Sequence, residues 1–309
     1  MALLFYSQFD DPADWGKHLR DAMPGLDFRV WPDVGDAKNI TSALVWKAPE
    51  GELRKFPNLK LIINLGAGVD SIVNDKSLPA GIPIVRISDP DMSRMMAQYV
   101  LGAVLRHYRD FVSFARAQRE RRWHYIHPRE APACGVGIMG LGNLGGMAAQ
   151  ELVRQGFQVS GWARSAKRIE GVESFHGKSG LAPFLAKSEI LAVMLPLTPE
   201  TDGLLDAQAL AKLPRGAKLI NVGRGQLVDE DALIAALTSG HIAEATLDVF
   251  REEPLPAASP LWGFDQVLVT PHLASVAIPR TASRQVAENL RRLEGGEPLL
   301  NVVDPERGY

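Results

Sequence analysis

One stretch of the sequence predicts the fold class of this chain: Gly135-Val136-Gly137-Ile138-Met139-Gly140-Leu141-Gly142-Asn143-Leu144-Gly145. Its first five residues are an apolar run typical of a buried strand, and residues 143–155 have the pattern of a helix. Between them, Gly140 permits a tight turn, Gly142 lets the backbone approach a pyrophosphate, and Gly145 lets helix and strand pack closely. The stretch therefore predicts a dinucleotide site at a helix N-terminus. A glycine-rich turn that only packs a helix on a sheet is the alternative.

Short apolar segments alternate with helical segments on both sides of this motif, which predicts an α/β fold with parallel sheets. Six predicted strands begin with the motif: residues 135–139, 157–162, 190–195, 217–222, 243–249 and 267–270. Six is the number of a full dinucleotide-binding sheet. Five further strands precede it: residues 3–6, 27–31, 42–45, 60–65 and 83–87. One long helix over residues 92–121 and a polar loop over residues 123–132 are expected to connect the two sets.

Length and composition exclude several classes of protein. A chain of 309 residues favours two domains. Its 34 basic and 36 acidic residues argue against nucleic-acid binding, which needs a basic field. We expect no membrane span, because the apolar runs are short, and no secretory leader, because acids follow the first residues. The single cysteine, Cys134, excludes an internal disulfide and a cysteine-rich zinc site. The expected location is the cytoplasm.

The segment after the second of these six strands, residues 157–162, indicates which nicotinamide cofactor binds. Asp or Glu about 20 residues beyond the glycines usually binds the ribose hydroxyls of NAD. Here Ala163 stands at that position, and basic or hydroxyl residues follow: Arg164, Ser165, Lys167 and Arg168. A guanidinium binds a phosphate through two hydrogen bonds, whereas a carboxylate would repel it. The loop therefore predicts NADPH over NADH, with a solvated basic loop as the alternative.

Three segments that end predicted strands carry charged or titratable side chains. They contain Arg224 between two glycines, Asp248 with Glu253, and His272 after Thr270-Pro271. Ligands of open α/β sheets bind beyond the carboxyl ends of strands, so these segments are expected to converge. An arginine can bind a carboxylate and polarise a neighbouring carbonyl, and an imidazole beside a carboxylate can deliver a proton. Each residue alone also fits a surface or turn role.

With these segments the whole chain resembles the D-isomer-specific 2-hydroxyacid dehydrogenase family, nearest its glyoxylate/hydroxypyruvate reductase A branch. Further landmarks are Leu65-Gly66-Ala67-Gly68-Val69-Asp70, Leu195-Pro196-Leu197-Thr198-Pro199-Glu200-Thr201 and Leu247-Asp248-Val249-Phe250. The resemblance implies that Arg224 binds the substrate carboxylate, that His272 is the acid/base, and that Glu253 is its partner. It implies cofactor contacts from these residues: Gly140, Gly142, Asn143, Leu144, Gly145, Trp162, Arg164, Ser165, Lys167, Leu195, Pro196, Thr201, Val222, Gly223, Asp248 and His272. The implied substrate contacts are Trp46, Gly66, Ala67, Gly68, Val69 and Arg224.

The resemblance also implies the domain layout and the assembly. Residues 1–98 and 282–309 would form a discontinuous, flavodoxin-like substrate domain, and residues 99–281 an inserted Rossmann domain that binds NADP. A homodimer is expected, with the long helix at its interface, although core packing explains that helix equally well. Relatives carry a second arginine where Ala166 stands here, so Arg168 would have to substitute for it. No metal is expected, because the histidines have no ligand spacing.

The sequence thus predicts an NADPH-dependent reductase of small 2-oxo acids, with glyoxylate and hydroxypyruvate as leading substrates. Trp46 is expected to wall the substrate pocket and favour small acids, or else to fill the core between the domains. A reductase of larger 2-oxo acids is the first alternative. A non-catalytic, nucleotide-sensing protein on the same fold is the second, because a fold does not determine a function.

Overall fold

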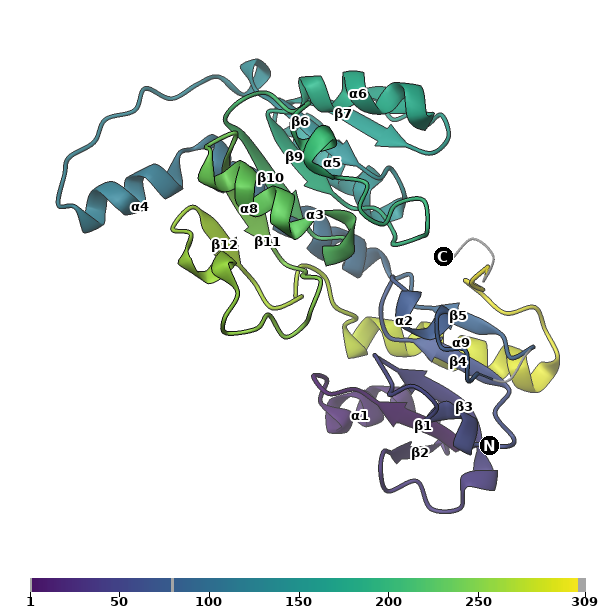
Figure 1. Ribbon diagram of the computed structural model, residues 1–309. Coiled ribbons are helices and arrows are strands. Elements are labelled where there is room, and N and C mark those ends of the chain that lie inside the picture. The colour runs from purple at the N-terminus through teal and green to yellow at the C-terminus, as the bar shows by residue number, and fades with distance from the viewer. Residues whose placement is uncertain (1, 79–80, 305–309) are drawn as a thin grey trace. The chain divides into compact units, whose positions relative to one another are not determined.

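Two compact units make up the computed structural model, which describes residues 2–78 and 81–304 (Figure 1). One unit comprises Met1–Met92 with Val276–Tyr309, and the other comprises Ser93–Ser275. The chain therefore leaves the first unit once and returns to it near its end. Sequence analysis places both boundaries a few residues further along, after residues 98 and 281. Part of the predicted substrate domain lies outside the described residues, namely residues 1, 79–80 and 305–309.

The first unit contains a parallel sheet with the strand order β2-β1-β3-β4-β5 among its described residues. Its strands are β1 (Ala2–Tyr6), β2 (Asp27–Val30), β3 (Ile40–Val45), β4 (Leu61–Asn64) and β5 (Ile84–Arg86). Its helices are α1 (Pro12–Ala22), α2 (Asp70–Val73) and α9 (Pro279–Gly295), with short 3₁₀ turns at Ala37–Asn39 and Leu53–Lys55. This strand order is that of flavodoxin-like folds, as expected.

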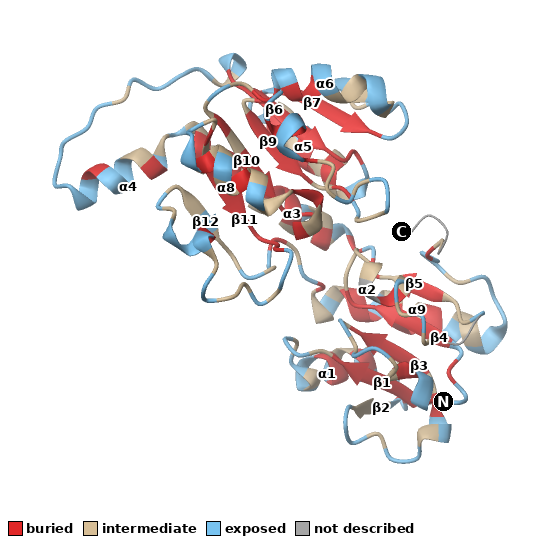
Figure 2. Cartoon of the chain, viewed as in Figure 1, coloured by how far each residue is buried: buried red, intermediate tan, exposed pale blue. Residues whose placement is uncertain are grey.

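Both faces of the first sheet are covered, which explains its nearly continuous apolar strands. Successive side chains of β1 point to opposite faces. Phe5 packs in one buried cluster with Trp15 of α1 and Leu290 of α9. Leu4 packs on the other side with Ile62 of β4. In Figure 2 the strands β1, β3 and β4 are accordingly buried, whereas the edge strand β2 and the outer faces of α1 and α9 are not.

The second unit contains a parallel sheet with the order β12-β11-β10-β9-β6-β7-β8 among its described residues. Its strands are β6 (Gly135–Met139), β7 (Gln158–Ala163), β8 (Val172–His176), β9 (Ile190–Val193), β10 (Ala217–Asn221), β11 (Ile242–Leu247) and β12 (Val267–Val269). Counted from β6, this is the dinucleotide-binding order 3-2-1-4-5-6 with one added strand. The predicted α/β class with two doubly wound parallel sheets is therefore confirmed.

Helices flank this second sheet on both faces (Figure 1). They are α3 (Pro90–Tyr108), α5 (Asn143–Arg154), α6 (Gly177–Lys187), α7 (Ala207–Leu210) and α8 (Glu230–Thr238), with 3₁₀ turns at Ala131–Ala133, Gly225–Leu227 and Pro260–Gly263. A further helix of this unit, α4 (Phe111–Arg119), extends away from the sheet (Figure 1). Val136 and Ile138 of β6 pack with α3 and α5, whereas Met139 packs on the opposite face. None of the described helices is long and apolar enough to span a membrane.

Two sequence expectations are wrong. The dinucleotide sheet has a strand that the six predicted ones omit, β8, whose sequence Val-Glu-Ser-Phe-His is largely exposed at the sheet edge. An edge strand with few buried side chains has no apolar run to reveal it. The single helix over residues 92–121 is instead two helices, α3 and α4. They are separated at Asp110, whose φ of 57° is left-handed and incompatible with a continuous α-helix.

Candidate active site

The turn between β6 and α5 is built for close backbone packing. A Cβ on Gly145 would lie 1.8 Å from the carbonyl oxygen of Gly140, so helix and strand meet at a distance that requires glycine. On Gly142, by contrast, a Cβ would meet no other described atom within 4 Å. The protein's own packing does not demand this glycine, and the open space at the α5 N-terminus fits a pyrophosphate. Two further predicted cofactor residues begin α5: Asn143 and Leu144.

The basic loop follows β7, and its side chains are accessible. Arg164, Ser165 and Lys167 are all exposed at the carboxyl end of that strand. Trp162, another predicted cofactor residue, is only 8% exposed, and its indole Nε1 donates to the carbonyl oxygen of Gly177 at 2.9 Å. The loop thus presents positive charge to solvent, whereas Trp162 belongs to the hydrophobic core beneath it.

The loop after β9 faces the same region. Leu195 is buried and Pro196 is exposed, while the Thr201 hydroxyl donates to the Pro196 carbonyl at 2.7 Å and so closes the loop on itself. Hydrogen bonds from its own backbone amide and from Thr198 lower the pKa of Glu200, and the charge of Arg164 lowers it further. The basic loop therefore lies within electrostatic range of this loop, and sequence analysis quoted Glu200 without assigning it a role.

Arg224 follows β10 on a loop that a buried asparagine organises. The Asn221 side chain accepts from the Gly223 amide at 3.1 Å and donates to the Arg224 carbonyl at 2.9 Å. The Arg224 guanidinium donates to the Gly223 carbonyl at 2.7 Å and is partly exposed, while Val222 is buried. The loop packs tightly against the segment that follows β11, because a Cβ on Gly225 would lie 1.9 Å from the Phe250 carbonyl carbon. Asn221 is a site residue that sequence analysis missed.

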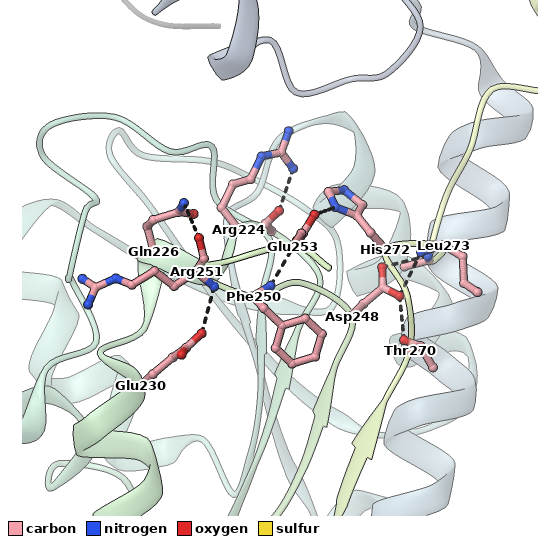
Figure 3. A network of polar contacts seen from close by, with 12 residues as sticks. Arg224, Gln226, Glu230, Asp248, Phe250, Arg251, Glu253, Thr270, His272 and Leu273 are labelled. Carbon is pink, nitrogen blue, oxygen red and sulfur yellow. Dashed lines mark hydrogen bonds and ion pairs between the residues drawn. The ribbon is translucent and has the colours of Figure 1, made fainter. Parts of the chain in front are cut away.

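The structure brings His272 and Glu253 into direct contact. The His272 Nδ1 lies 2.8 Å from Glu253 Oε2, and the two side chains point toward each other in Figure 3. The other carboxylate oxygen of Glu253 accepts from the Phe250 amide at 3.1 Å. Both side chains keep partial solvent access, with 23% and 19% exposed. An imidazole oriented by a fixed carboxylate is suited to proton transfer.

Asp248 holds the turn that carries His272. Its carbonyl oxygen accepts from the His272 amide at 2.8 Å. Its buried carboxylate accepts from the Thr270 hydroxyl at 2.6 Å and from the amides of Leu273 and Ala274, both at 2.9 Å. Three consecutive amides, those of residues 272–274, are therefore bound by one residue. Figure 3 shows Asp248 beside Thr270 and Leu273. Thr270 is a second site residue that sequence analysis quoted without assigning it a role.

In the first unit, the predicted substrate loop after β4 is also tied by an asparagine. The Asn64 side chain donates to the carbonyl oxygens of Gly66 and Gly68, both at 2.8 Å. The Trp46 ring covers Gly66, where a Cβ would lie only 2.4 Å from the ring. Ala67 and Gly68 are partly exposed, and Val69 is buried. The predicted residues of this loop and Trp46 therefore form one local group within that unit.

Among the described residues, neither the single cysteine nor a cluster of metal-binding side chains forms a further centre. Burial raises the pKa of the Cys134 thiol to about 11, so it stays protonated at neutral pH. Among the described residues, no group of three or more His, Cys, Asp or Glu side chains is arranged to hold a metal ion.

Comparison with known proteins agrees with this geometry. The family model described as "D-isomer specific 2-hydroxyacid dehydrogenase, NAD binding domain" matches residues 101–274. A glyoxylate/hydroxypyruvate reductase A from Serratia proteamaculans is 40% identical over an alignment that covers 100% of both chains. The chain belongs to the D-isomer specific 2-hydroxyacid dehydrogenase family. As a member of this dehydrogenase family it is an oxidoreductase, and the motif-based family prediction is confirmed.

Solved structures of D-isomer specific 2-hydroxyacid dehydrogenases resemble the entire chain. One from Xanthobacter autotrophicus Py2, in complex with NADPH and MES, is 61% identical, with a TM-score of 0.95 over 100% of this chain and 99% of that one. An NADPH-dependent glyoxylate/hydroxypyruvate reductase from Sinorhizobium meliloti, in complex with NADP and sulfate, is 34% identical. Its TM-score is 0.93, over 100% of both chains.

Proposed function

We propose that this protein is an NADPH-dependent reductase of small 2-oxo acids that converts glyoxylate to glycolate and hydroxypyruvate to D-glycerate. One observation carries the proposal. The loops with Arg224, Glu253 and His272 follow three adjacent strands, β10, β11 and β12, at the carboxyl edge of a dinucleotide-binding sheet. That edge is where ligands of such sheets bind.

The three side chains have complementary tasks in a carbonyl reduction. The forked guanidinium of Arg224 binds the substrate carboxylate and polarises the neighbouring carbonyl. His272 turns Nδ1 toward Glu253, so Nε2 is the ring nitrogen that delivers a proton to the carbonyl oxygen. Glu253 stabilises the protonated imidazole and orients it. In the reverse direction, the same imidazole removes the hydroxyl proton.

NADP fits the residues that this chain offers. The open space at Gly142 and the N-terminus of α5 would take the pyrophosphate, and the exposed Arg164, Ser165 and Lys167 would take the 2′-phosphate. The relatives from Xanthobacter autotrophicus and Sinorhizobium meliloti, which were crystallised with NADPH or NADP, support this choice. When bound, the cofactor supplies the hydride that reduces the carbonyl carbon.

Two observations support a preference for small substrates: the names of the curated relatives and the position of Trp46. Relatives that are 38% to 40% identical over their full length are glyoxylate/hydroxypyruvate reductases. We assign the backbone amides of Gly66, Ala67, Gly68 and Val69 to the substrate carboxylate. The Trp46 ring, packed on Gly66, would act as a wall that leaves room for a short side chain.

A substrate panel tests the proposal. Initial rates are measured with NADPH and with NADH on glyoxylate, hydroxypyruvate, pyruvate and a branched 2-oxo acid. We expect NADPH and the two shortest acids to give the highest kcat/KM. A preference for the branched acid would identify a reductase of larger 2-oxo acids. NADPH binding without turnover of any 2-oxo acid would instead indicate a nucleotide-sensing protein, and a preference for NADH would contradict the role of the basic loop.

We also propose that the enzyme is a homodimer of the cytoplasm, where a free buried thiol such as Cys134 stays reduced. The support for a dimer is the arm, defined as residues 109–130, which contains α4 and extends away from the sheet of its own unit (Figure 1). Several aromatic side chains of the arm are exposed, up to 98% for Trp123: Phe111, Phe114, Trp123 and Tyr125. Such exposure is typical of a surface that a second copy covers.

A further inference from the structure

A chain of hydrogen bonds links helix α3 to the turn that carries His272. The Tyr99 hydroxyl of α3 lies 2.6 Å from the Thr270 hydroxyl, which in turn lies 2.6 Å from Asp248 Oδ1. Tyr99 is far from the other two in sequence, on a helix with no residue in the predicted site. It reaches them because α3 packs against the sheet of the second unit. Figure 3 shows the Asp248–Thr270 end of this chain beneath His272.

The chemistry of the three groups determines which of them donates each hydrogen bond. An ionised carboxylate only accepts hydrogen bonds, so Thr270 donates to Asp248. The lone pairs of the Thr270 oxygen are then left to accept, and Tyr99 is the donor. Burial raises the pKa of Tyr99 to about 12, with a smaller contribution from the Asp248 charge, so the phenol keeps the proton it donates. Each donor in such a chain polarises the next.

Asp248, at the end of this chain of hydrogen bonds, determines the conformation of the turn that carries His272. His272 has a φ of 54°, a left-handed conformation that is unfavourable for a non-glycine residue. Asp248 offsets this cost by binding the amides of His272, Leu273 and Ala274. Oδ1 receives both Thr270 and Leu273, so losing the Thr270 hydroxyl would release this oxygen to shift. Any such shift moves the amides that hold the imidazole in place.

We propose that Tyr99, acting through Thr270, is a positioning residue that fixes Asp248 and thereby the His272 imidazole. The inference rests on the proposed function only in naming His272 as the proton donor. Tyr99 does not touch the reacting atoms in this assignment. Its contribution is to hold the turn in the geometry that proton transfer requires, which raises kcat rather than the affinity for NADPH.

Four variants of the full-length enzyme test this role. Thr270→Val removes the hydroxyl at nearly constant volume, Thr270→Ser restores it, and Tyr99→Phe removes only the phenol oxygen. The matched control is Tyr108→Phe on the same helix, whose hydroxyl donates to the Arg129 carbonyl instead. We expect kcat on glyoxylate to fall about tenfold in T270V and about threefold in Y99F, with the KM for NADPH changed less than about twofold. T270S should recover most of the kcat lost in T270V, and Y108F should match the wild type.

Three further measurements separate positioning from a loss of folding. Because Tyr99 acts only through Thr270, the double variant Y99F/T270V should be no slower than T270V alone. Amide hydrogen exchange of the segment 270–275 should quicken in Y99F and T270V, while thermal unfolding midpoints stay close to that of Y108F. Additive losses of kcat, or unchanged exchange in this segment, would overturn the proposal. If the wild type reduces no 2-oxo acid, the proposed function fails, and hydrogen exchange alone then decides whether Tyr99 positions the turn.

Discussion

At the residue scale, the site depends on side chains that are fixed by their neighbours before any ligand binds. Glu253 uses one oxygen for the Phe250 amide and the other for the His272 imidazole. The carboxylate that contacts His272, the proposed acid/base, is therefore oriented by its own loop. This arrangement lets each residue be tested by a substitution that leaves the others in place.

Replacing His272 by alanine should reduce kcat by about 10²–10⁴-fold, because the proposed proton donor is lost. The Kd for NADPH, measured by fluorescence titration, should change less than about threefold, since the phosphates are bound elsewhere. His18→Ala, on α1 of the first unit, is the control and should have wild-type kinetics. Equal losses of NADPH binding and of turnover would contradict the proposed acid/base role of His272.

Replacing Arg224 by alanine should reduce kcat/KM for glyoxylate by about 10²–10³-fold, mainly through substrate binding and carbonyl polarisation. Arg224→Lys keeps the charge but loses the fork, so its kcat/KM should lie between those of the wild type and R224A. Arg251→Ala is the matched control, because that exposed side chain points away from His272 (Figure 3). Unchanged glyoxylate kinetics in R224A would remove this residue from the site.

At the scale of elements, asparagines that end two strands organise two functional loops. Asn64 ends β4 and binds the carbonyls of Gly66 and Gly68, and Asn221 ends β10 and binds the Arg224 loop. Sequence analysis found both loops through their glycines and Arg224. It missed the asparagines, because a lone buried asparagine has no pattern that separates it from other polar residues near a turn.

The glycines of the β6–α5 turn predict two contrasting phenotypes. Gly145→Ala places a Cβ against the Gly140 carbonyl and should destabilise the ligand-free protein by about 1–3 kcal/mol. Gly142→Ala meets open space, so its stability should fall by at most about 1 kcal/mol, the cost of alanine at an N-cap. Its NADPH affinity should nevertheless drop about tenfold or more. Urea unfolding and NADPH titration of both variants measure this; equal effects on stability would contradict it.

A buried histidine joins α3 to β11 and predicts a pH dependence of stability. His107 Nδ1 lies 2.7 Å from Glu244, and Nε2 lies 3.0 Å from the Thr246 hydroxyl. Burial lowers the pKa of His107, against the raising effect of Glu244, while the charges of Arg106 and Lys218 lower it further. A lowered folded-state pKa contributes stability that is present above the ordinary value of 6.5 and is lost as the pH falls through the folded-state pKa.

Urea unfolding of the wild type and of His107→Gln, from pH 5 to pH 8, checks this prediction. The wild type should be more stable by about 2 kcal/mol at pH 8, because a glutamine amide does not reproduce the geometry in which the two imidazole nitrogens contact Glu244 and Thr246 together. The difference should shrink toward pH 5. A difference that stays constant or grows on acidification would show that His107 is not kept neutral by burial.

At the scale of the whole molecule, the exposed aromatic residues of the arm predict a dimer. Light scattering coupled to size exclusion should give about twice the mass of one chain. The double variant Phe111→Ser, Trp123→Ser should shift the protein toward the monomer, because it removes apolar area from the proposed interface. Phe9→Ser, which alters an exposed aromatic residue outside the arm, should stay dimeric. A monomeric wild type would contradict the proposed assembly.

Local sequence patterns were enough to predict the fold class and to name most residues of the candidate site. Apolar runs of strand length, the GxGxxG turn and the residues that end β10, β11 and β12 are contiguous in the chain and imply their own geometry. Only the tertiary structure revealed β8, because a strand at a sheet edge is defined by its neighbour rather than by buried side chains. It alone also joined Tyr99 to Thr270 across 171 residues and His107 to Glu244 across 137. Contacts of that range depend on how helices pack on the sheet, which no local pattern records.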